Sequence, residues 1–326
     1  MFTLRQYLLA LLDSRGLTRT LGEIDVCRDE QGRPCFSAGN SAAVFRIRLG
    51  GRIRSLRCYL RPMRHLKEIY GQRLLEKELY LHTSPETGVW VDTVLGDWIE
   101  GSTLHETVAQ AAALRDRESL QILVRLFDRL ALALVTDDRA HGDLKPENII
   151  VGDDGTLCPI DFDASYLPAF AGEISPELGT AAYQHPARTA ADFDERIDDY
   201  PAALISTALH ALAEDPTLWD RYGSSDGLLY TPQRIASDPA YRETLALFEK
   251  RGMAVQYRIA QLLTAPTLRL FGLAELLAEA VREKPAARSG TEAETPELFV
   301  ENGRWGYRTA ERVVVAPLYD NGFDFT

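Results

Sequence analysis

The chain has 326 residues, of which 45% are hydrophobic and 26% are charged, as in an ordinary folded globular protein. Its formal net charge of −12 excludes a general nucleic-acid or anionic-membrane binder, because phosphate-rich surfaces require a basic face. The four cysteines form no zinc pattern, and no apolar run approaches the roughly 20 residues that cross a bilayer, so we expect a cytoplasmic protein without nucleic-acid or membrane partners.

The first hundred residues have mainly the patterns of a sheet. Hydrophobic residues recur at helical spacing in residues 3–14 and again in residues 66–81, which predicts two helices. Gly50 and Gly51 predict a hairpin turn between two alternating segments. Strands are expected at residues 23–27, 43–49, 52–60 and 89–98.

The pattern changes to helices after Gly101. Two short strands, at residues 149–151 and 157–160, flank a turn at residues 153–155. Helices are expected at residues 104–113, 119–137, 197–213, 242–251, 255–263 and 273–283. A sheet-rich part followed by a helix-rich part predicts a bilobal α+β protein.

The chain therefore divides into five segments. Residues 284–297 are rich in Pro, Ala and Glu without apolar periodicity, which is typical of a linker, and residues 298–326 return to strand-like alternation. The predicted order is an N-terminal helix and lead-in at 1–22, a β-rich lobe at 23–100, a helical lobe at 101–283, the linker at 284–297 and a short β segment at 298–326.

One loop holds the groups that phosphoryl transfer needs. Asp143 offers a carboxylate that can accept the proton of an acceptor hydroxyl, and Lys145 offers a cation for the charge on the transferred group. Hard oxygen ligands for Mg²⁺ come from Asn148 and from Asp161, which directly follows the second short strand.

These residues resemble the bacterial eukaryotic-like Ser/Thr protein kinases. The motif His-Gly-Asp-Leu-Lys-Pro-Glu-Asn at residues 141–148 differs from the family's catalytic loop only where Gly142 replaces Arg, and Asp-Phe-Asp at residues 161–163 stands where Asp-Phe-Gly is expected. The resemblance implies a protein-kinase-like fold with a β-rich N-lobe and a helical C-lobe. It also implies that ATP and Mg²⁺ are cofactors, with Asp143 as the base and Lys145 at the transferring phosphate. Asn148 and Asp161 would be the metal ligands.

Further motifs follow the family's order along the chain. Gly-Thr at residues 179–180 resembles the loop that receives the acceptor peptide, so Thr180 is expected near Asp143. Asp198 resembles the buried aspartate that braces the catalytic loop at His141. The segment from Trp98 to Glu100 resembles the hinge whose backbone faces adenine, and His-Pro-Ala at residues 185–187 takes the place of Ala-Pro-Glu.

The nucleotide-facing motifs depart from the family pattern. Of the three expected phosphate-loop glycines only Gly39 is present, and Arg57 falls where the lysine is expected. Arginine keeps the charge but has a wider, longer fork. Its expected partner is Glu76, with Glu78 in reserve, on the helix predicted at residues 66–81.

Three other positions also differ. Gly142 removes the arginine that would answer an activation-loop phosphate, so activity independent of such phosphorylation is expected. Asp163 replaces a flexible glycine and either adds a carboxylate near the metal or restricts the loop, and Ala187 cannot form the ion pair of its glutamate counterpart.

The last segment resembles one WG β-repeat. Asn302 and Gly303 suit a hairpin turn, and Trp305 and Tyr307 alternate with polar neighbours. Such repeats occur in series, so we expect either an array that continues beyond Thr326, which we favour, or a unit that packs on the kinase or on a protein partner.

The favoured function is an ATP- and Mg²⁺-dependent Ser/Thr protein kinase acting on an unidentified protein substrate. Arg57 and the sparse glycines leave a nucleotide-binding pseudokinase or scaffold as an alternative. The His-Gly-Asp loop leaves a second one, a small-molecule phosphotransferase of the aminoglycoside-kinase type.

Overall fold

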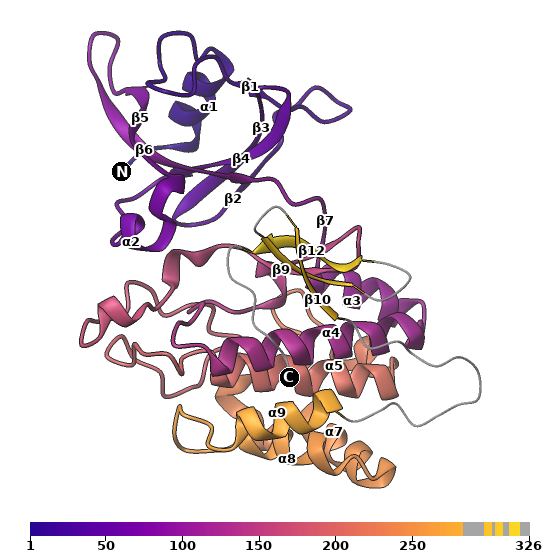
Figure 1. Cartoon of the computed structure of the whole chain (residues 1–326). Coiled ribbons are helices and arrows are strands. Elements are labelled where there is room, and N and C mark those ends of the chain that lie inside the picture. The colour runs from indigo at the N-terminus through magenta and orange to yellow at the C-terminus, as the bar shows by residue number, and fades with distance from the viewer. Residues whose placement is uncertain (283–296, 302–303, 309–312, 320–326) are drawn as a thin grey trace. The chain divides into compact units, whose positions relative to one another are not determined.

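The computed structural model describes residues 1–282, 297–301, 304–308 and 313–319, with side chains described up to residue 282 (Figure 1). The chain divides into two compact units, Met1–Ile99 and Glu100–Thr326. The division falls inside the segment from Trp98 to Glu100 in which the sequence predicts a hinge. The lead-in at residues 1–22 lies within the first unit.

The first unit is built on an antiparallel sheet. Its strands are β1 (Asp25–Val26), β2 (Phe36–Ala38), β3 (Ala42–Leu49), β4 (Arg52–Tyr59), β5 (Leu74–His82) and β6 (Gly88–Asp97). They pair in the order β1-β3-β4-β6-β5, and β2 also pairs with β3. Gly50 and Gly51 join β3 to β4 with φ of +56° and +80°, a backbone that glycine adopts without steric cost. The expected hairpin and the strands flanking it are confirmed.

Helix α1 (Leu4–Leu12) covers one face of this sheet. Thr3 begins the helix with a reciprocal capping box, in which its hydroxyl accepts from the Gln6 amide and the Gln6 side chain accepts from the Thr3 amide. Tyr7 is fully buried and its hydroxyl donates to the carbonyl oxygen of Tyr59 at 2.6 Å. Together with the apolar side chains of β3 and β4, α1 forms the core of the first unit.

The helix predicted at residues 66–81 is wrong for most of its length. Only α2 (Leu66–Tyr70) is α-helical, followed by one 3₁₀ turn at Gly71–Arg73 and then by strand β5. Gly71 ends the helix with a φ of +52°. The leucines of residues 74–81 fit either period, and pairing with β6 selects the strand.

Strand β5 also anchors the lead-in through Glu78. This carboxylate is 1% exposed and accepts hydrogen bonds from the amides of Arg19, Thr20 and Leu21 at 2.8–3.1 Å, as well as from the Thr20 hydroxyl at 2.6 Å. A buried charge in this setting is satisfied by several oriented N–H groups. The segment before β1 is therefore an integral part of the first unit.

The second unit is mainly helical. Its helices are α3 (Leu104–Ala113), α4 (Arg117–Thr136), α5 (Asp199–Glu214), α6 (Leu218–Tyr222), α7 (Pro239–Arg251), α8 (Ala254–Leu262) and α9 (Leu273–Arg282). All of the helices expected from the sequence after residue 101 are confirmed within a few residues, and α6 is additional. Helices α4 and α5 lie side by side (Figure 1) and contribute much of the buried core.

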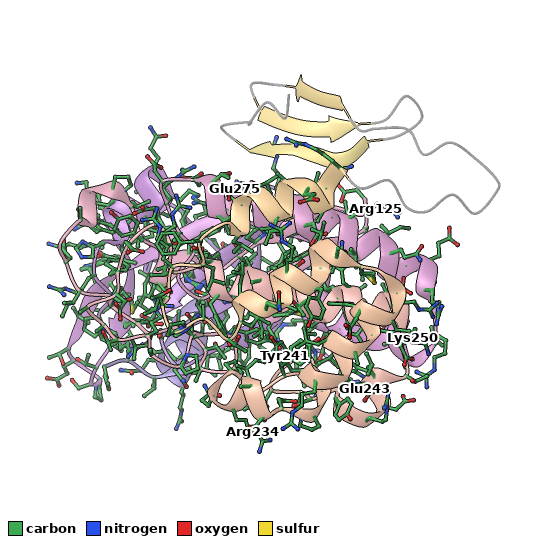
Figure 2. The ribbon with its side chains drawn as sticks, turned by 90° about the horizontal axis from the view of Figure 1, so that it is seen from below. Arg125, Arg234, Tyr241, Glu243, Lys250 and Glu275 are labelled. Carbon is green, nitrogen blue, oxygen red and sulfur yellow. The ribbon has the colours of Figure 1, made fainter. Side chains whose placement is uncertain are left out.

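The packing of the remaining helices is tied to this core by buried polar contacts. The Tyr241 hydroxyl on α7 donates to the carbonyl oxygen of Ala260 on α8 at 2.8 Å, and Figure 2 shows Tyr241 among these helices. At the start of α5, Asp199 accepts the amide of Leu270 at 3.1 Å. In the described part of the chain no helix is long and apolar enough to cross a membrane.

A small sheet positions the predicted motifs. Strands β7 (Gly101–Thr103), β8 (Ile149–Gly152) and β9 (Leu157–Pro159) pair in that order, with the expected turn between β8 and β9. The loop at residues 141–148 therefore leads directly into β8, and only Ile160 separates β9 from the motif at residues 161–163. A curled antiparallel sheet in one unit and helices in the other are compatible with the bilobal kinase-like fold.

The C-terminal segment forms a third antiparallel sheet of β10 (Glu297–Glu301), β11 (Arg304–Arg308) and β12 (Val313–Tyr319). Glu301 pairs with Arg304, so the predicted strands on both sides of the Asn302-Gly303 turn are present. The turn itself lies outside the described residues, as does the linker expected at 284–297 except for Glu297. The resemblance to a WG repeat stays a prediction.

Candidate phosphotransfer site

Asp198 binds the start of the catalytic loop through hydrogen bonds to its backbone amides. Its carboxylate is 1% exposed and accepts the amides of His141 at 2.5 Å and Gly142 at 3.0 Å. Burial raises the pKa of the Asp198 carboxyl, and the His141 and Gly142 amides oppose that change. Asp198 thus lies where the resemblance places a bracing aspartate.

His141 ties the loop to the segment that follows β9. Its Nε2 donates to the carbonyl oxygen of Ile160 at 2.8 Å, and its Nδ1 accepts the amide of Asp143 at 3.3 Å. A carbonyl oxygen can only accept, so this pattern requires the Nε2-protonated tautomer. The ring also packs against Phe162, with centroids 5.0 Å apart. His141 therefore couples the two motifs.

The Asp143 carboxylate is at the centre of the polar contacts. Its Oδ1 accepts the amide of Thr180 at 2.5 Å, and its Oδ2 lies 3.2 Å from Asn148 Nδ2 and 3.3 Å from Lys145 Nζ. Lys145 Nζ also donates to Thr180 Oγ1 at 2.8 Å. These contacts join the catalytic loop to the Gly-Thr segment at the predicted base, although Asp143 and Thr180 are 37 residues apart in the sequence.

The donor set at Asn148 and Asp161 fits Mg²⁺. Asn148 donates two side-chain hydrogen bonds through Nδ2, to the carbonyl and carboxylate oxygens of Asp143, and neither of them uses its Oδ1. The carbonyl oxygen of Asn148 accepts the amide of Ile160 at 2.8 Å, which brings the residue before Asp161 against Asn148. An amide oxygen and a carboxylate are hard ligands, and Mg²⁺ usually completes its shell with water and phosphate oxygens.

Asp161 has an unusual backbone. Its φ of +68° and ψ of +63° lie in the left-handed region, which is uncommon for a residue other than glycine and occurs often at functional sites. The neighbouring Asp163 is buried at 4% exposure. Within the Asp-Phe-Asp motif, Asp163 is thus buried, whereas Asp161 and Phe162 are partly exposed.

Gly142 has a steric role that the sequence comparison did not reveal. Its φ is +81°, and a Cβ atom added there would lie 2.0 Å from the carbonyl oxygen of Ala164. Gly179 is similarly confined, because its added Cβ would lie 2.7 Å from the carbonyl oxygen of Gly142. An arginine at position 142 is therefore incompatible with this loop conformation.

The predicted nucleotide-binding residues of the first unit lie on its sheet. Gly39 is exposed in the β2–β3 hairpin, and its amide donates to the carbonyl oxygen of Ala42 at 2.9 Å. Arg57 is on β4, opposite Val44 of β3. Trp98 follows β6 and lies under the guanidinium of Arg46 at 5.6 Å.

Glu76 and Glu100 complete the predicted set. The helical setting expected for Glu76 is wrong, because it lies exposed on β5, where its carboxylate is 3.4 Å from Lys67 Nζ. The alternative partner predicted for Arg57, Glu78, accepts hydrogen bonds from the backbone amides of the lead-in. Glu100 is the exposed first residue of the second unit.

Two buried polar residues near Asp143 were missed at the sequence level. Arg188 and Gln184 contact each other, and Arg188 also contacts the carbonyl oxygen of Gly142. In the sequence, residues 185–187 stand out only because Ala187 replaces the glutamate of the family motif. No single-sequence signal distinguishes a buried arginine from an exposed one.

Comparisons with known proteins point to protein kinases. A CBL-interacting protein kinase 17 from Oryza sativa subsp. japonica is 28% identical over 172 residues, covering 50% of this chain and 35% of that protein. The serine/threonine-protein kinase PknL of Mycobacterium tuberculosis is 34% identical over 113 residues, covering 33% of this chain and 27% of PknL. No family model matches the chain.

The matches span about a third of the length of these curated relatives. They support a distant relationship to protein kinases, as the catalytic-loop motif predicts. The relationship agrees with phosphotransfer chemistry.

Proposed function

We propose that this protein is a Ser/Thr protein kinase that transfers the γ-phosphate of ATP, in the presence of Mg²⁺, to a hydroxyl of a protein substrate. The observation that carries the proposal is the contact of Thr180 with both Asp143 and Lys145. It joins the loop expected to receive the acceptor peptide to the base and to the phosphate-binding cation.

The chemistry follows from these contacts. The acceptor hydroxyl attacks the γ-phosphorus, the bond between that phosphorus and the ADP oxygen breaks, and the hydroxyl proton passes to Asp143. Thr180 uses one lone-pair position of Oδ1, which leaves another on the same oxygen for the hydroxyl. Lys145 offsets negative charge on the transferred group, and Asn148 and Asp161 would hold Mg²⁺, which neutralises the phosphates.

The decisive experiment is phosphate transfer by the full chain to a generic protein and to itself. Asp143→Asn keeps the size of the side chain but removes the base, so transfer should fall by roughly 10² to 10⁴. The matched control is Asp153→Asn, an exposed turn residue. Equal rates for wild type and Asp143→Asn would contradict the assignment of the base.

A second function, a nucleotide-binding scaffold, is favoured by one observation. The segment expected to form a helix carrying Glu76 is strand β5, so the predicted helical setting of Glu76 is not the one observed. Thermal-shift titration with ATP, with and without Mg²⁺, followed by a turnover assay separates the two functions. Binding without transfer to any protein or metabolite supports the scaffold, and ATP consumption stimulated only by metabolites supports a small-molecule kinase.

The location and partners belong to the same proposal. A cytoplasmic bacterial kinase whose β10–β12 segment binds a protein partner agrees with the net charge and with the WG resemblance. Affinity capture on the full chain, compared with a chain ending at residue 282, tests the partner.

A further inference from the structure

The buried side chain of Arg188 takes no part in the chemistry proposed above. It is 9% exposed. Its Nη1 donates to the carbonyl oxygen of Gly142 at 3.0 Å and to Oε1 of Gln184. Its Nε and Nη2 are buried and have no hydrogen-bond partner among the described residues. A guanidinium buried with two unpartnered nitrogens is costly, so its position needs a compensating interaction.

The compensation comes from nearby carboxylates. Burial lowers the pKa of Arg188, and the negative charges of Asp198 and Asp143 oppose that change most strongly, followed by those of Asp192 and Asp194. Arginine keeps its charge in proteins, so the group remains a buried cation. Its largest favourable electrostatic interactions are with Asp198, which accepts the loop amides, and with Asp143, the proposed base.

The Arg188 side chain lies where two backbone segments, at Gly142 and Gly179, approach each other closely. The carbonyl oxygen of Gly142, which accepts from Arg188, would lie 2.7 Å from a Cβ added at Gly179, and Gln184 Nε2 would lie at the same distance. Gly142, Gly179 and Gln184 therefore form one packed junction. Arg188 binds one member from the catalytic loop and one from the segment that carries Thr180.

We propose that Arg188 is a positioning residue that locks the catalytic loop to the Thr180 segment and supplies, from elsewhere in the chain, the cation that position 142 lacks. Gly142 has no room for a side chain, so a cation for this junction must come from another segment. The inference rests on the proposed kinase function. Its consequence is a loop held in its hydrogen-bonded arrangement without an activation-loop phosphate.

The kinetic test compares Arg188→Met, Arg188→Lys and the control Arg234→Met in the full chain. Arg234 is exposed in the 3₁₀ segment Pro232–Ser237, and Figure 2 labels it at the edge of the view. Arg188→Met should lower kcat/KM for a protein acceptor by about 10²-fold, because the acceptor loop is displaced, and leave KM for ATP unchanged. Arg188→Lys should recover part of the loss, since it keeps the charge but not the fork.

A second measurement does not depend on turnover. Hydrogen exchange should be faster in Arg188→Met at the amides of His141, Gly142 and Thr180, which are hydrogen-bonded to Asp198 or Asp143, and should be unchanged in Arg234→Met. Faster exchange in a chain whose wild type transfers no phosphate would support the positioning role while the proposed function fails.

Three outcomes would overturn the inference. One is wild-type exchange and wild-type kinetics in Arg188→Met. Another is loss of wild-type activity after phosphatase treatment, because the lock would then need a phosphate. If Arg188→Met does not fold, Arg188→Gln decides, because it removes the charge but keeps a hydrogen-bond donor, and wild-type exchange at all three amides in that variant would reject the lock.

Discussion

In the proposed reaction, alignment of the acceptor depends on the contacts of Thr180 with Asp143 and Lys145. Replacing Thr180 by Val keeps the β-branched shape and the amide donor to Asp143 but removes the hydroxyl that accepts from Lys145. Losing a hydrogen bond to a charged group of this kind is worth about 1.5 kcal/mol, roughly tenfold in rate.

We therefore expect Thr180→Val to lower kcat/KM for a protein acceptor about tenfold, with KM for ATP unchanged, in steady-state assays. Thr180→Ser restores the hydroxyl and is expected to approach wild-type rates. A Ser variant as slow as the Val variant would show that the hydroxyl is not the operative group.

Gly142 offers a test of the close approach in the catalytic loop. Both Gly142 and Gly155 have positive φ, but a Cβ at Gly155 would meet nothing within 4 Å, whereas a Cβ at Gly142 would meet the Ala164 carbonyl oxygen. Gly155→Ala should therefore cost only the backbone strain, about 1 kcal/mol, and retain activity.

Gly142→Ala is expected to cost clearly more stability than Gly155→Ala and to abolish transfer, because the loop must move away from residue 164. Chemical denaturation and a transfer assay on the two variants measure both effects. Similar stability and similar activity in the two variants would argue against the close approach.

At the scale of elements, strand β5 depends on its contact with the lead-in. Glu78→Gln replaces a carboxylate that accepts three amides by an amide whose NH₂ group opposes one of them. Weakening such charge-assisted hydrogen bonds in a buried site should destabilise the first unit by about 2 kcal/mol.

Hydrogen exchange at residues 19–21 should report this loss directly, together with a lower midpoint in chemical denaturation. Glu86→Gln, in the exposed turn between β5 and β6, is the matched control. Undiminished protection of these amides in Glu78→Gln would mean that the lead-in is held by other contacts.

At the scale of the whole molecule, stability should depend on pH through Asp199. Burial raises the pKa of this carboxyl to about 6, above its unfolded value near 3.8. A raised folded pKa means that the folded state binds the proton more tightly, so the free energy of unfolding rises as pH falls through 6 toward 4. Between pH 7.5 and 5 the gain is about 1 kcal/mol.

Asp199→Asn should remove this gain and stabilise the chain at pH 7.5, because the amide oxygen can still accept from Leu270 without a buried charge. The pH dependence of the free energy of unfolding is measured from denaturation curves at pH 5 and pH 7.5. The curves compare the wild type with Asp199→Asn and with the exposed control Asp153→Asn. An unchanged pH dependence in Asp199→Asn would assign the effect to other groups.

Much of the architecture was predictable because local patterns and packing agree. The alternation around Gly50 and Gly51, and the apolar stripes of α4 and α5, predict elements that burial then reinforces. The helix predicted at residues 66–81 was wrong because the leucines there fit both the helical period and the strand period. Only pairing of β5 with β6 decides between them.

For the candidate site, the sequence by itself determined which chemical groups are close to one another. Asp143, Lys145 and Asn148 lie within six residues of the chain, so any fold keeps them near one another, and their types match those that phosphoryl transfer uses. Asp161 follows β9, which must lie beside β8 because their connection is short.

Tertiary structure alone decided how that loop is held. Thr180, Arg188 and Asp198 come from distant segments, and hydrogen bonds and charge bring them to residues 141–143 only when the helical unit folds. The physical reason is that a short motif specifies which groups are present, whereas burial and the geometry of long-range contacts specify their partners. Gly142 shows the difference, because its lack of a side chain reads as a lost cation in the sequence and as a required close approach in the fold.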